Sequence, residues 1–86
     1  MDARTFPRIT PQDFSRIRFL LESNGMEVSP GSQGTIRHAK HGIDLGFKYN
    51  EVSHELTLTI EKKPFLIPSS AIWNEVQKSF EKHMPG

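Results

Sequence analysis

Two stretches in which apolar and polar residues strictly alternate constrain the fold of this chain more than any other feature. They lie in "GIDLGFKYN" and "HELTLTIEK", within residues 42–62. A period of two is typical of a β-strand with one buried face. One pairing puts every apolar side chain on the same face, and a slip of one residue destroys it. Its pairs are Tyr49 with Leu56, Phe47 with Leu58 and Leu45 with Ile60. The sequence therefore predicts an antiparallel hairpin with the loop "NEVSHE".

A helix is predicted to begin at "TPQD", residues 10–13. Thr10 is a good N-cap, Pro11 suits the first helical position, and Asp13 favours the positive end of the helix dipole. The helix is expected to run to about Asn24. Gly25 then provides the left-handed residue that commonly ends a helix.

A second helix is predicted after Ser69 or Ser70. Its apolar residues fall within about 100° of the helical wheel, the width expected of a stripe that faces a core. They are Ile72, Trp73, Val76 and Phe80. A further strand is predicted to begin near Ile36. The sequence does not decide whether residues 26–29 form an additional short strand.

These elements predict an α+β fold of the two-layer sandwich type. Its antiparallel sheet has three to four strands, and both helices cover one face, in the order α-β-β-β-α with residues 26–29 as the optional first strand. Residues 1–9 are expected to be an extended N-terminal arm anchored by Phe6 and Ile9. Residues 10–84 are expected to be a single α+β domain.

Composition excludes several classes of function. The chain has 86 residues, no cysteine and a formal net charge of +1, so one small domain without disulfides or thiolate chemistry is expected. No apolar run approaches the roughly twenty residues of a membrane span, and the N-terminus has no apolar signal segment. The sequence predicts a cytoplasmic protein with no cofactor and no membrane partner.

The segment "TIRHAKHG" contains His38 and His41, which are three residues apart. In a strand this spacing sends the two rings to opposite faces, and zinc requires a third and usually a fourth ligand. They are therefore weak metal candidates, and no metal is expected. "SPGSQGT" lacks the lysine of a phosphate-binding loop, and no serine lies in a nucleophile elbow. No catalytic residue is nominated, and the chain is not expected to be an enzyme.

The leading prediction is a small non-catalytic module that binds another protein or associates with itself. Phe19 lies about 140° from Phe14 on the helical wheel, where the arm either covers it or leaves it exposed. Residues 65–67 lie between two prolines and either plug the end of the core or form an exposed apolar lip. The candidate partner-binding residues are Phe19, Phe65, Leu66 and Ile67. A strand such as residues 35–40, if it lies at a sheet edge, offers a site for self-association.

The alternative prediction is an RNA-binding domain. The element order resembles that of double-stranded RNA-binding domains, which implies contact with RNA, although their Gly-Pro-x-His loop and their lysine cluster are absent here. The basic residues that would contact phosphates are Arg16, Arg18, Arg37, Lys40, Lys62 and Lys63. "LLESNGMEVSPGSQG" is also similar to the first helix and loop of HicA-type mRNA interferases. Gln33 stands where their catalytic histidine would be, so this resemblance implies no activity.

Overall fold

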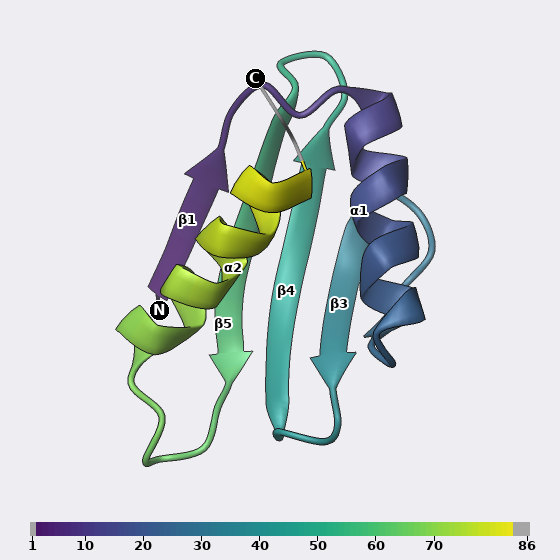
Figure 1. Cartoon of the computed structure of the whole chain (residues 1–86). Helices are drawn as coiled ribbons and strands as arrows, with labels where there is room; N and C mark the ends of the chain where they lie inside the picture. Colours follow the sequence, from purple (N-terminus) through teal and green to yellow (C-terminus); the bar gives the residue numbers. More distant parts are fainter. Residues whose placement is uncertain (1, 84–86) are drawn as a thin grey trace.

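The computed structural model describes residues 2–83, which form a five-stranded antiparallel sheet and two helices (Figure 1). The strand order across the sheet is β1-β5-β4-β3-β2. The elements in chain order are β1 (Asp2–Phe6), α1 (Pro11–Ser23), β2 (Glu27–Val28), β3 (Gln33–His38), β4 (Ile43–Asn50), β5 (Glu55–Lys62) and α2 (Ser69–His83).

The predicted hairpin is confirmed with its register. In β4 and β5, Tyr49 pairs with Leu56, Phe47 with Leu58, and Leu45 with Ile60. Except for half-buried Leu45, these side chains are buried, because they all point to the face that is removed from water. The alternation of apolar residues therefore determined the register.

The sheet has five strands where the sequence predicts three to four. Residues 2–6, expected to be part of an arm, form β1 and pair antiparallel with β5, so that Arg4 lies opposite Leu58 and Phe6 opposite Leu56. The sequence "DARTF" has no alternating apolar pattern. A strand at this edge of the sheet does not require one, because it buries only part of one side chain, that of Phe6. At the other edge, β2 is a two-residue strand within residues 26–29.

The N-terminal end of α1 has the predicted cap. Thr10 Oγ1 accepts a hydrogen bond from Asp13 N at 3.1 Å, and Asp13 Oδ2 accepts one from Thr10 N at 3.2 Å. This reciprocal pair is a capping box, which satisfies two backbone donors that a helix leaves free. At the other end Gly25 has φ +86°, the left-handed conformation expected after the last turn.

Both helices lie in front of the sheet in the view of Figure 1, with α2 crossing β5 and α1 beside β3. Phe14 of α1 stacks on Tyr49 with a centroid distance of 4.4 Å. Phe6 of β1 meets Phe80 of α2 edge-on at 4.7 Å. Ile17 of α1 and Trp73 of α2 belong to the same buried apolar cluster as the inward residues of the sheet.

The segment between β1 and α1 is attached to the end of the β4–β5 hairpin. Ile9 is 1% exposed, its N–H donates to His54 O at 2.8 Å, and its carbonyl accepts from Tyr49 Oη at 2.5 Å. The predicted anchoring by Phe6 and Ile9 is therefore observed. The predicted domain boundary at residue 84 lies outside the described residues.

The edges of the sheet are β1 and β2, and β3 lies between β2 and β4. The condition under which residues 35–40 would offer a site for self-association is therefore not met at Ile36 and Arg37, because β2 pairs with them. The optional short strand at residues 26–29 is present as β2, and the added β1 distinguishes this arrangement from the predicted order. Within residues 2–83, neither helix has the length and hydropathy needed to cross a membrane.

Candidate functional site: an apolar pocket between the two helices

An apolar pocket of about 170 Å³ lies between α1, α2 and the inner face of the sheet. The sheet forms its floor with inward residues of β3, β4 and β5, and each helix supplies one wall. Residues that line it include Ile17 and Leu21 of α1, Val76 and Phe80 of α2, and Leu45 and Leu58 of the sheet. These are members of the periodic stripes that the sequence assigns to the core, so the pocket is a part of the core that remains open.

The volume limits what the pocket can hold. A cavity of about 150 Å³ lined by aliphatic and aromatic side chains binds benzene, so one ring or one branched side chain fits here. Pockets that enclose larger ligands measure about 300–1,000 Å³. The pocket is therefore the size of a single apolar group.

Arg18 lines the pocket with its guanidinium near two aromatic rings. Its Cζ is 4.9 Å from the ring centroid of Phe14 and 5.8 Å from that of Phe47. Its guanidinium also donates a hydrogen bond to the carbonyl oxygen of Gly31. These contacts hold a cation beside an apolar wall, an arrangement that the ring quadrupole favours.

The other polar residues that line the pocket are His38, His41, Glu75 and Ser79. Among residues 2–83 no hydrogen bond or ion pair joins one of these four side chains to another. His38 Nδ1 and Arg18 Nε are buried without a hydrogen-bond partner in the same part of the chain. Buried polar atoms usually have a hydrogen-bond partner. A ligand that brought an oxygen acceptor to Arg18 Nε or His38 Nδ1 would therefore offset the free-energy cost of burying that atom unpaired.

The two histidines of "TIRHAKHG" stack on each other, although within a single strand their spacing would send the rings to opposite faces. Their ring centroids are 4.5 Å apart and the planes are 12° from parallel. β3 ends at His38 and the next residues turn, so the strand alternation no longer applies at His41. Among the side chains of residues 2–80, no three from His, Asp or Glu are grouped so that they could hold a metal ion.

The four predicted partner-binding residues do not lie together. Phe65 and Leu66 are almost fully exposed in the loop before α2, whereas Ile67 is partly buried against the core. Phe19 is 59% exposed on α1. The arm does not cover Phe19, because its Phe6 packs against Trp73 and Phe80 instead.

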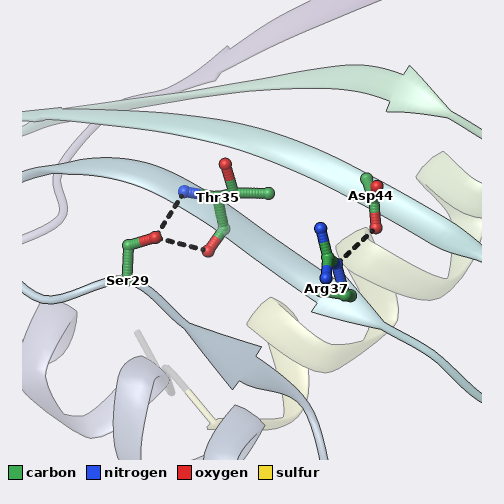
Figure 2. Close-up of polar contacts among 4 residues, drawn as sticks. All are labelled: Ser29, Thr35, Arg37 and Asp44. Carbon is green, nitrogen blue, oxygen red and sulfur yellow. Dashed lines mark hydrogen bonds and ion pairs between the residues drawn. The ribbon is translucent and has the colours of Figure 1, made fainter.

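The outer face of the sheet carries polar residues, as Figure 2 shows for four of them. Arg37 Nε lies 3.5 Å from Asp44 Oδ1 across β3 and β4, and Ser29 Oγ accepts a hydrogen bond from Thr35 N at 3.0 Å. Glu27, Val28, Ser29, Thr35 and Arg37 line a shallow polar hollow of about 360 Å³ at this edge. The hollow has no apolar wall comparable to that of the pocket between the helices.

The basic residues proposed for RNA contact are spread over the molecule. Arg16 and Arg18 belong to α1, and Arg18 is half-buried at the pocket. The others lie in β3, in the turn that follows it and at the end of β5: Arg37, Lys40, Lys62 and Lys63. RNA binding through these six residues stays a prediction.

Sequence reasoning did not find the pocket, because its existence depends on the space between two helices far apart in the chain. It also did not nominate Glu75 and Ser79. The signal available was their position on α2 next to the apolar residues Val76 and Phe80.

Comparison with known proteins adds no relative whose properties could be transferred to this pocket. No protein-family model matches the sequence, and no curated protein or solved structure matches it either. The function must therefore be argued from the geometry of the chain itself.

Proposed function

We propose that this chain is a non-catalytic binding module that receives one apolar side chain of a protein partner in the pocket between α1 and α2. The observation that carries the proposal is the open apolar pocket of about 170 Å³. Apolar surface left in water is a source of binding free energy once a partner covers it. The proposal takes both helices to cover one face of the sheet, and it includes the cytoplasmic location expected from the sequence.

The size of the pocket favours a side chain over a cofactor. Protein interfaces derive most of their binding energy from a few anchors, often aromatic, that fill well-packed pockets. A single such anchor matches the volume, whereas a nucleotide or flavin would not be enclosed. Arg18 and Glu75 at the lining supply one charge of each sign for polar contacts around the anchor.

Indole, the ring of a tryptophan side chain, is a suitable probe of this pocket. We expect indole to shift the methyl NMR signals of Ile17, Leu45 and Val76, which line it, and to leave those of exposed Val52 unchanged. A Val76→Phe substitution fills the space and should weaken indole binding by about tenfold or more, which corresponds to about 1.4 kcal/mol.

Asn74→Phe is the matched control, because Asn74 is exposed on the same helix and does not line the pocket. It should bind indole as the unaltered chain does. If indole perturbs no pocket methyl group, or if both variants weaken binding equally, the proposal is wrong.

A further inference from the structure

The loop between β5 and α2 presents two adjacent apolar side chains to the solvent. Phe65 is 94% exposed and Leu66 is 89% exposed. Contiguous apolar surface that is left exposed can mark a contact site. Neither side chain lines the pocket described above, so they form a separate surface.

A tight turn holds these two residues in place. Ile67 N donates a hydrogen bond to Pro64 O at 3.1 Å, so Phe65 and Leu66 occupy the two central positions of a β-turn. Ile67 packs against the core, and Pro64 restricts the backbone on the other side. Central turn positions usually hold Gly, Pro, Asn, Asp or Ser, so a Phe-Leu pair there has no explanation in turn chemistry.

Lysines surround this turn. Lys62 and Lys63 precede it directly, and Lys40 lies in the β3–β4 turn. Figure 1 shows both loops at the same end of the sheet, and a Cβ added at Gly42 would lie 3.9 Å from Pro64 Cγ. We call Lys40 together with residues 62–66 the tip.

The three lysines of the tip take part in no ion pair with another side chain of residues 2–80. The acidic residues that the strand register places near this end of the sheet include Asp2, Glu27, Asp44 and Glu61. Asp44 is paired with Arg37 at 3.5 Å, and the exposed Glu61 side chain lies over Gly46 on the surface of the sheet. The lysine charges are thus available to an anionic partner.

We propose that the tip docks at an anionic lipid bilayer, with Phe65 and Leu66 entering the interface and the lysines contacting the headgroups. Apolar side chains beside cations are the chemistry that interfacial membrane binding uses. The sequence predicts no membrane partner because no stretch is long enough to span a bilayer, but docking at the surface requires only a short protruding turn. A bilayer suits two side chains that protrude together, because it offers a broad apolar layer beneath its charges.

Vesicle co-sedimentation of the full chain tests the proposal. We expect binding to vesicles of phosphatidylcholine mixed with phosphatidylserine, little binding to phosphatidylcholine alone, and weaker binding as salt is raised. Each of Phe65→Ser and Leu66→Ser should weaken binding by about tenfold or more. Each of Lys62→Gln and Lys63→Gln should weaken it about fivefold.

Val52→Ser is the matched control, because Val52 is 90% exposed in the β4–β5 loop at the opposite end of the sheet. It should bind vesicles as the unaltered chain does. Circular dichroism should show all five variants folded, since none of these side chains is part of the buried core. A tryptophan introduced by Leu66→Trp should show a blue-shifted emission on anionic vesicles.

Three results would overturn the proposal. One is no binding of the unaltered chain to anionic vesicles at low salt, and another is equal loss in Val52→Ser and Phe65→Ser. The third is self-association that Phe65→Ser abolishes while vesicles remain unbound, which would assign the tip to protein contact. None of these results bears on indole binding in the pocket, so the two proposals fail separately.

Discussion

At the scale of the residue, the side chain of Tyr49 joins the N-terminal segment to the sheet. Its hydroxyl donates to Ile9 O at 2.5 Å, and its ring stacks on Phe14. Tyr49→Phe keeps the ring but leaves the buried carbonyl of Ile9 without its donor. We expect the free energy of unfolding to fall by about 1–3 kcal/mol, measured by urea denaturation near neutral pH. Tyr49→Leu should cost more, because it also removes the stack.

The same hydroxyl predicts an alkaline limit to stability. Burial, then the charges of Glu51 and Asp13, raises the pKa of Tyr49 above its ordinary value of 10.0. Below pH 10.0 the hydroxyl is protonated in both states, and its contribution is complete. Above that pH the unfolded chain ionises first, so stability falls as pH rises through the raised pKa. Tyr49→Phe should show a shallower alkaline loss in urea denaturation at a series of pH values.

At the scale of the element, the capping box decides how firmly α1 begins. Thr10→Ala removes the acceptor of the Asp13 N–H bond at 3.1 Å and should destabilise the protein by about 1 kcal/mol. For a domain of this length that lowers Tm by about 4–8 °C in a thermal melt followed by circular dichroism. Thr10→Ser keeps the hydroxyl and should melt near the unaltered chain. A Thr10→Ala melt that matches the Thr10→Ser melt would contradict this role.

At the scale of the whole molecule, β1 closes the edge of the sheet next to β5. Removing residues 1–6 leaves the β5 edge unpaired and takes Phe6 from the ring of Trp73, whose centroid is 6.4 Å away. The emission of Trp73, the only tryptophan, should shift to the red, and amide exchange in β5 should accelerate. Phe6→Leu, which keeps the strand, should change both far less. If the truncated chain shows native emission and exchange, β1 is dispensable.

Local features of the fold could be predicted because their signals lie within a few residues of one another. Thr10, Pro11 and Asp13 specify the start of α1, and Gly25 its end. Strict alternation specified the β4–β5 register, because any slip would expose every apolar side chain of one strand. The edge strand β1 could not be predicted and β2 was left open, since both bury too little apolar surface to show a period.

The candidate site was predictable only in part. Phe65 and Leu66, which belong to the tip and not to the pocket, could be singled out because these apolar residues follow neither helical nor strand periodicity. The pocket was not identified, because its wall residues, such as Ile17 and Val76, have the same pattern whether or not a neighbour fills the space. Whether His41 lies beside His38 could not be predicted, because it depends on where β3 ends and that point is not visible in the sequence.

By itself the sequence determined the limits of α1, the central hairpin and the absence of any thiol. Caps and alternation act within a few neighbouring residues, and composition does not depend on the fold. Only the tertiary structure decided that the N-terminal segment is an edge strand, that His38 and His41 stack, and that a pocket of about 170 Å³ opens between the helices. These features depend on where distant segments meet. The volume left between two packed elements is a property of their spacing, and no single segment contains it.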